Sequence, residues 1–292
     1  MFPDGFRRHS HCGSEITINL QEGGNGPPLL LLHGYPQNHV MWHRLAPLLR
    51  QQFHLVCPDL RGYGDSDKPE GGPDHAGYSK RAMARDMVEV MQALGYQRFA
   101  VAGHDRGARV AHRMMLDFPE RVSRGCVMDI APTLHMFETT DQTFATGYYH
   151  WFFLIQPDGL PERMIGADPD YYLQQKLQRW SAPGARFDPD AVADYLRCFR
   201  DPATIHASCE DYRAAAGIDL THDRADRGRR LEQPLLVLWG KRGFVHRQYD
   251  VAGVWRDYAS DMQAAALDAG HFLPEEVPEA VAAELQRFFA AP

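Results

Sequence analysis

One stretch of the sequence decides the fold: Val101-Ala102-Gly103-His104-Asp105-Arg106-Gly107. The apolar residues that open it predict a buried strand, and residues 106–118 have the apolar spacing of a helix. Gly103 and Gly107 bracket Asp105 with the spacing of the nucleophile elbow, G-x-S-x-G, in which a sharp turn holds one side chain above a sheet. Here that side chain is an aspartate. The alternative is an ordinary turn in which the aspartate only caps the helix.

Apolar runs and helical patterns alternate on both sides of this turn. Strands separated by helices predict a mostly parallel sheet with helices on both faces. The first run alternates apolar and polar residues, which is typical of an edge strand. We expect strands at residues 16–20, 29–32, 54–57, 99–103, 122–130, 234–240 and 264–267, and helices at 42–49, 79–94, 106–118 and 278–289.

The pattern changes in the middle of the chain. Residues 132–228 carry aromatic clusters and helical spacing without a clear strand, so we expect a helical cap inserted into a core formed by residues 1–131 and 229–292. Ligands in such sheets bind beyond the carboxyl ends of the strands. A cap in that place would exclude water from the crevice.

Composition narrows the classes of function. The 292 residues include 31 Lys and Arg against 38 Asp and Glu, a formal charge of −7, which disfavours nucleic acid as a partner. The apolar runs are too short to span a bilayer, and the first eight residues contain no apolar region typical of a secretory signal. The 5 scattered cysteines favour a cytoplasmic location, and the 15 histidines show no metal-binding spacing, so we expect no metal.

An aspartate nucleophile implies substitution at an sp³ carbon, which forms an alkyl ester that water must then cleave. The second step needs a general base and an oxyanion hole. We predict that the base is His271, because it follows the last expected strand, where the order nucleophile, acid, histidine places it. The alternative is that one of many histidines falls there by chance.

The acid that orients this histidine is less obvious. The loop after Gly240 is a common place for it but contains no carboxylate, whereas Asp129 stands at the end of the preceding strand. A carboxylate among apolar residues needs a partner such as a histidine N–H. We therefore predict Asp129 as the orienting acid, and the alternative is a cap for the segment that follows.

The oxyanion hole is expected from two backbone N–H groups. One loop that commonly supplies such a group is His33-Gly34-Tyr35-Pro36, and the residue after the nucleophile supplies the other. We assign the backbone N–H groups of Tyr35 and Arg106 to this role. An ordinary turn forced by glycine and proline would have the same sequence.

Two arginines favour an anionic substrate. Arg106 and Arg109 lie on one side of the first helical turn, where cations oppose the helix dipole. A guanidinium forks onto a carboxylate through two hydrogen bonds, so a carboxylate substrate explains both residues. The alternative is that they pair with Asp59, Asp129 or acids of the cap.

Taken together, these motifs identify a family. Along nearly its whole length the chain resembles fluoroacetate dehalogenases, a branch of the α/β-hydrolase superfamily. The Asp-Arg-x-x-Arg elbow, combined with a His-Trp pair and a tyrosine, is the most specific part of the match. The matching stretches are 33–38, 59–66, 103–109, 149–151, 206–213 and 270–272.

The resemblance implies an α/β-hydrolase fold, no cofactor, a small haloacid substrate and a homodimer. It also implies that His150, Trp151 and Tyr212 donate hydrogen bonds to the leaving halide. Fluoride is small and strongly hydrated, so several donors must replace its water as charge develops. Imidazole, indole and phenol supply such donors. Taken alone, these residues would be explained better by packing inside the cap, and it is the elbow that favours the halide role.

The hypothesis is a haloacetate dehalogenase that converts fluoroacetate or chloroacetate to glycolate and halide. The rival enzyme is an epoxide hydrolase, which shares the aspartate nucleophile and would use Tyr148, Tyr149 or Tyr212 as acids; a neutral epoxide, however, needs no arginine pair. A serine esterase is disfavoured because the elbow holds no serine, and a ligand-binding protein without catalysis stays open. Ala108 and the basic loop Lys241-Arg242-Gly243 depart from the family pattern. The preferred halide and the tolerance for larger acids stay open.

Overall fold

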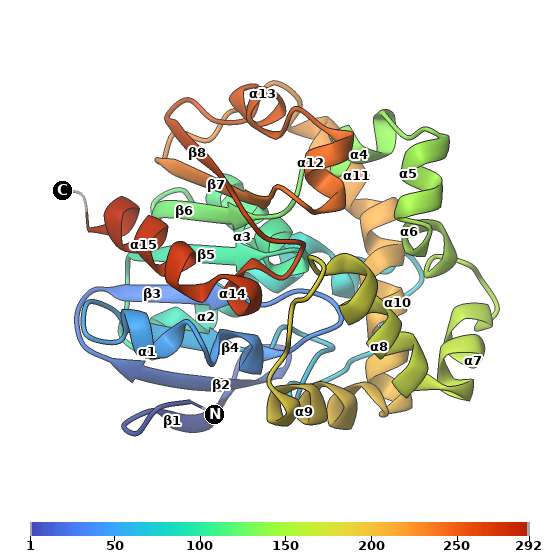
Figure 1. The fold of residues 1–292 in the computed structure, drawn as a ribbon, viewed down its shortest axis with the longest axis horizontal. Helices are drawn as coiled ribbons and strands as arrows, with labels where there is room; N and C mark the ends of the chain where they lie inside the picture. Colours follow the sequence, from blue (N-terminus) through green and yellow to red (C-terminus); the bar gives the residue numbers. More distant parts are fainter. Residues whose placement is uncertain (1, 291–292) are drawn as a thin grey trace.

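An eight-stranded sheet forms the centre of the structure, a computed structural model that describes residues 2–290. The strand order is β1-β2-β4-β3-β5-β6-β7-β8 (Figure 1). The pairs β1–β2 and β2–β4 are antiparallel and the other pairs are parallel. The strands are β1 (Arg7–Cys12), β2 (Thr17–Gly24), β3 (Pro28–Leu32), β4 (His54–Pro58), β5 (Phe99–His104), β6 (Val122–Met128), β7 (Leu235–Gly240) and β8 (Met262–Leu267).

Helices cover both faces of this sheet, as the sequence predicts. Figure 1 shows α1 and α15 in front of the sheet and α2 and α3 behind it. Leu29 to Leu32 of β3 are fully buried, because a central parallel strand packs against helices on both sides. The helices of the core are α1 (Ala46–Leu49), α2 (Lys80–Ala93), α3 (Arg106–Asp117), α12 (Phe244–Gln248), α13 (Val251–Arg256), α14 (Leu273–Glu276) and α15 (Pro278–Phe289), with 3₁₀ turns η1 (His39–Trp42) and η2 (Ala76–Tyr78).

Three expectations need correction. The strand expected at the edge is not an edge strand, because β2 pairs with β1, whose polar sequence RRHSHC gave no apolar alternation to detect. The helix expected over residues 42–49 is divided into η1 and α1. The strand expected to reach residue 130 ends at Met128, because Asp129 has φ 54 and accepts a hydrogen bond from the N–H of Gly240 at 3.0 Å.

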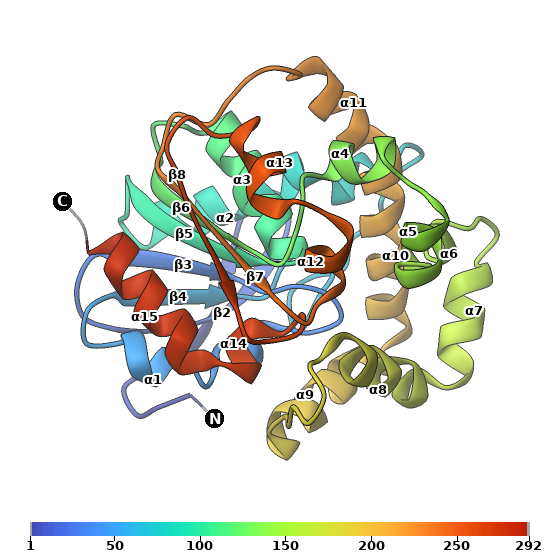
Figure 2. The ribbon, with the colours of Figure 1, turned by 45° about the horizontal axis from the view of Figure 1, so that its top comes forward.

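The segment between β6 and β7 contains eight helices, α4 to α11, and no strand among its described residues. Most of them lie to one side of the sheet, as Figures 1 and 2 show. The division of the chain at residues 132 and 228 stays a prediction. The helices are α4 (Thr133–Glu138), α5 (Gln142–Gly147), α6 (His150–Phe153), α7 (Leu160–Ala167), α8 (Pro169–Trp180), α9 (Pro189–Phe199), α10 (Pro202–Ala216) and α11 (Ile218–Ala225).

Within residues 2–290, no helix is both long enough and apolar enough to cross a membrane.

Candidate active site

Asp105 stands at the sharp turn between β5 and α3. Its backbone has φ 48 and ψ −114, a conformation that L-residues rarely adopt and that functional sites often retain. The turn needs glycine nearby: a Cβ on Gly107 would lie 2.3 Å from the carbonyl oxygen of Leu32. Ala108, which departs from the family pattern, is accommodated as a buried residue of α3. The elbow therefore presents the carboxylate at the carboxyl end of the central strand β5.

Two backbone N–H groups approach one oxygen of this carboxylate. The N–H of Arg106 donates to Oδ1 of Asp105 at 2.6 Å and the N–H of Tyr35 donates to the same atom at 3.3 Å. These are the two groups that the sequence assigned to the oxyanion hole. The first contact also means that Asp105 caps α3. The geometry is therefore compatible with both interpretations of the turn, the nucleophile elbow and the helix cap.

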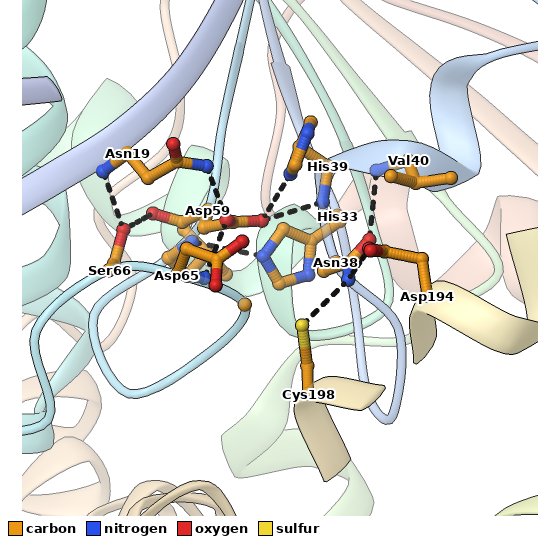
Figure 3. A network of polar contacts seen from close by, with 12 residues as sticks. Asn19, His33, Asn38, His39, Val40, Asp59, Asp65, Ser66, Asp194 and Cys198 are labelled. Carbon is orange, nitrogen blue, oxygen red and sulfur yellow. Dashed lines mark hydrogen bonds and ion pairs between the residues drawn. The ribbon is translucent and has the colours of Figure 1, made fainter. Parts of the chain in front are cut away.

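A buried network fixes the loop that carries Tyr35 (Figure 3). Asp59 accepts hydrogen bonds from the backbone N–H of His39 at 2.8 Å and from the side chain of Asn19 at 2.7 Å. The Nε2 atom of His33 accepts from the N–H of Leu60 at 2.9 Å. These contacts join the loops after β3 and β4. They hold the loop of residues 33–36, called the oxyanion loop below, against the elbow.

The same network reaches the inserted helices. Asn38 donates to a carboxylate oxygen of Asp194 at 2.8 Å and to Sγ of Cys198 at 3.4 Å, both on α9. Its side-chain oxygen accepts from the N–H of Val40 and so caps the start of η1 (Figure 3). One asparagine thus connects the oxyanion loop to the helices above it.

His271 follows β8 and faces Asp105. Its Nδ1 lies 2.7 Å from Oδ2 of Asp129, and its Nε2 lies 3.6 Å from Oδ2 of Asp105. Burial by itself lowers the pKa of this imidazole. The hydrogen bond and charge of Asp129, together with the charge of Asp105, outweigh burial and raise that pKa above its usual value. Nε2 is buried and has no hydrogen-bond partner within residues 2–290, and the carboxylate of Asp105 lies just beyond hydrogen-bond distance from it.

The two arginines of α3 have different surroundings. Arg106 is fixed by a cap acid: its Nε and Nη2 donate to the carboxylate of Asp211 at 2.8 and 2.6 Å. Arg109 forms no ion pair with any carboxylate among residues 2–290, and its donors reach only Ala131, Thr133 and Met136. Burial, and then the charge of Arg106, lower the pKa of Arg109. The alternative of pairing with acids therefore holds for one arginine and fails for the other.

Each arginine also keeps a donor without a partner. Nη1 of Arg106 and Nε of Arg109 are buried and make no hydrogen bond in the described chain. A buried N–H group left unpaired costs about 1–3 kcal/mol. The pair therefore provides positive charge and free donors close to Asp105.

The three expected halide donors meet above these arginines. The guanidinium carbon of Arg106 lies 4.1 Å from the ring centre of Tyr212, and that of Arg109 lies 4.7 Å from the ring of Trp151. The rings of His150 and Tyr212 are 5.5 Å apart. Burial, followed by the charge of Lys176, lowers the pKa of His150 well below its usual value, so its imidazole is neutral and has one N–H to donate.

The tyrosines of the rival hypothesis lie in different environments. Tyr149 is 43% exposed, and its hydroxyl accepts a hydrogen bond from Lys176. Tyr148 is buried. Burial, and then the charges of Asp129 and Asp105, raise its pKa well above its usual value. Tyr148 and Tyr212 thus stay near the carboxylates, and both are protonated.

Metal binding has no visible basis in this region. Across residues 2–290 no group of three or more His, Cys, Asp and Glu side chains is arranged to hold an ion.

A family model described as the α/β hydrolase fold matches residues 27–278 of the chain. The chain belongs to the α/β-hydrolase fold family. Within this family it is 48% identical to a curated fluoroacetate dehalogenase from Burkholderia sp over 98% of this chain and 95% of that protein. It is 33% identical to a soluble epoxide hydrolase from Corynebacterium sp. (strain C12), over 97% and 96% of the two chains. The crystal structure of ALR0039 from Nostoc sp PCC 7120, an α/β hydrolase, superposes with a TM-score of 0.97 at 56% identity, covering 98% and 99%.

These matches confirm the fold and the family resemblance read from the sequence, and the protein is a hydrolase. Sequence reasoning nevertheless missed two residues of this hydrolase site. Trp180 packs between Tyr35, His150 and His271. Asp211 is the counter-ion of Arg106. The only sequence signal for Asp211 was its place beside Tyr212 in a matching stretch, and Trp180 had none.

Proposed function

We propose that this hydrolase removes halide from haloacetates and forms glycolate through an ester on Asp105. The observation that carries the proposal is Arg109, a buried guanidinium beside Asp105 with no carboxylate partner in the described chain. A buried charge needs compensation, and the carboxylate of a substrate would supply it. An epoxide, which is neutral, would leave this cation uncompensated.

The first step is a substitution at carbon. The substrate carboxylate accepts from the free donors of Arg106 and Arg109, which places the α-carbon over Asp105. Oδ2 of Asp105 attacks, because Oδ1 is already held by two backbone N–H groups. A carbon–oxygen bond forms, the carbon–halogen bond breaks, and the halide leaves with the bonding electrons toward the N–H and O–H donors of the cap.

The second step returns the enzyme to its starting state. Nε2 of His271 removes a proton from water, and the resulting hydroxide adds to Cγ of Asp105. Negative charge then develops on Oδ1, where the N–H groups of Tyr35 and Arg106 stabilise it. The Cγ–Oδ2 bond then breaks, and glycolate leaves with Oδ2 as its hydroxyl oxygen and with the proton that His271 held. The carboxylic acid formed at Asp105 releases its proton to solvent. Ester formation also removes the charge of Asp105, one of the groups that raise the pKa of His271, which favours the neutral base when it is needed.

Halide release separates this proposal from its rivals. We expect fluoride or chloride from fluoroacetate and chloroacetate, and no diol from a panel of neutral epoxides. Diol formation without halide release would favour the epoxide hydrolase, and tight binding without turnover would favour a ligand-binding protein. The homodimer and the cytoplasmic location stay predictions.

The ester itself is tested with His271→Asn. This variant retains the nucleophile but has no base, so we expect it to accumulate a carboxymethyl group on Asp105 during incubation with chloroacetate. Intact-protein mass spectrometry followed by peptide mapping measures the adduct. An unchanged mass in a folded variant would contradict the two-step scheme.

A further inference from the structure

A cavity extends from exposed arginines to the buried imidazole of His271. It has a volume of about 550 Å³ and lies between α5, α8 and the loop that precedes α12. Tyr148, Trp180 and His271 form its inner wall. The residues assigned to bind the substrate carboxylate or the halide are not among the residues that line this cavity.

The charge of the cavity has one sign. Four cationic side chains line it, Lys176, Arg179, Arg242 and Arg247, and no aspartate or glutamate does. Arg242 forms an ion pair with Asp268, which does not line the cavity. The other three make no ion pair with a carboxylate of residues 2–290. This concentration of positive charge is unexpected in a chain with a formal charge of −7.

Lys176 is the most buried of these cations, since the three arginines are exposed. It is 3% exposed, and its Nζ lies 4.2, 4.8 and 5.1 Å from the ring centres of Tyr149, Tyr172 and Trp180. Its only hydrogen bond in the described chain goes to the hydroxyl of Tyr149 at 3.0 Å. Aromatic faces stabilise a cation by about 0.5–2 kcal/mol, less than a buried carboxylate would.

We propose that this basic cavity, lined by Lys176, Arg179, Arg242 and Arg247, is an outer binding site for a small carboxylate anion. The haloacid is held there before it moves past Trp180 to Arg106 and Arg109. The inference rests on the proposed function, and it adds a site at which substrate is captured.

Physical reasoning supports capture at this position. A cleft of uniform charge with low-dielectric walls concentrates ions of the opposite sign and raises their association rate by about 10- to 1,000-fold. The rest of this acidic chain would repel the same ions. Burial, and then the charge of Arg179, lower the pKa of Lys176 to about 7, and an anion in the cavity would favour the charged ammonium.

The kinetic test compares the double variant Lys176→Met/Arg179→Gln with the wild type. At low salt we expect kcat/KM for chloroacetate to fall about 10-fold or more, while kcat changes less than about twofold, because capture is lost and chemistry is not. Raising the ionic strength with sodium sulfate shortens the Debye length from about 30 Å at 0.01 M to about 3 Å at 1 M and should bring the wild type toward the variant. Arg98→Gln is the matched control, since this exposed arginine precedes β5 at the opposite end of the sheet. Equal kcat/KM and equal salt dependence in all three proteins would overturn the outer site.

A second readout needs no turnover. Trp180 lines the cavity, so the difference between wild type and Trp180→Phe isolates its fluorescence. Quenching of that signal by iodide should fall about threefold or more in the double variant, whereas quenching by neutral acrylamide should not change. If no haloacid releases halide but iodide quenching behaves as expected, the proposed function fails and the anion site stands. If halide release is normal and iodide quenching is unaffected, the anion site fails and the function stands.

Discussion

The two arginines of α3 should respond differently to the same substitution. In Arg109→Met the site loses a guanidinium that has no carboxylate partner in the described chain. In Arg106→Met it loses the partner of the fully buried Asp211, which then retains Lys80 and the hydroxyl of Tyr63. The first change should therefore damage catalysis more than folding, and the second should damage both.

The magnitudes follow from these contacts. A hydrogen bond to a charged group contributes about 1.5–3 kcal/mol, so Arg109→Met should lower kcat/KM for chloroacetate by about 10- to 150-fold. Its effect on the free energy of unfolding should stay within about 2 kcal/mol, because one carbonyl, that of Ala131, loses a donor while an unpaired buried charge disappears. Removing one partner of a buried ion pair costs about 3–5 kcal/mol, and we expect the lower end of that range for Arg106→Met because Lys80 remains.

Chloroacetate and its neutral amide, chloroacetamide, make the assay specific. Chloride release should show the loss for the acid and a change of less than about threefold for the amide in Arg109→Met. Arg109→Lys, which retains the charge without the planar fork, should recover part of the lost activity. Urea unfolding measures the stability of each variant. Equal losses for acid and amide, or equal destabilisation by the two methionine variants, would refute the assignment of Arg109 to the substrate carboxylate.

Two further results are expected. Gly107→Ala should destabilise the fold by about 1–3 kcal/mol, since its Cβ would lie 2.3 Å from the carbonyl oxygen of Leu32. Gly166→Ala is the control, because this glycine lies on α7 with open space around it. Thermal melting compares the two variants, and equal melting temperatures would contradict the close approach at Gly107. The rate of ester hydrolysis should fall as the pH drops through the raised pKa of His271, because the base must be neutral, and Asp129→Asn should move that acid limb to lower pH by removing a group that raises the pKa. If the pH profile does not move in Asp129→Asn, then Asp129 does not set the pKa of His271.

Most of the central strands and the elbow could be predicted because their signals are local. The apolar run of β3, the Ser79 cap of α2 and the glycines around Asp105 each act within a few residues along the chain. The polar strand β1 could not be predicted, since its pairing with β2 and not its own residues makes it a strand. The position of Asp129 lies between these cases, because the missing carboxylate after β7 pointed to it and the structure places it 2.7 Å from His271.

By itself, the sequence identified the residues to which we assign the chemistry: the carboxylate at the elbow, the histidine after the last strand and the arginines of the first helical turn. Only the tertiary structure decided how these groups are used. It pairs Arg106 with Asp211 across 105 residues of chain and brings Trp180 against His271. It leaves Arg109 without a carboxylate partner in the part of the chain that the structure describes. The reason is that local spacing fixes a turn or a helix face, whereas the partner of a buried charge depends on how the inserted helices pack against the sheet.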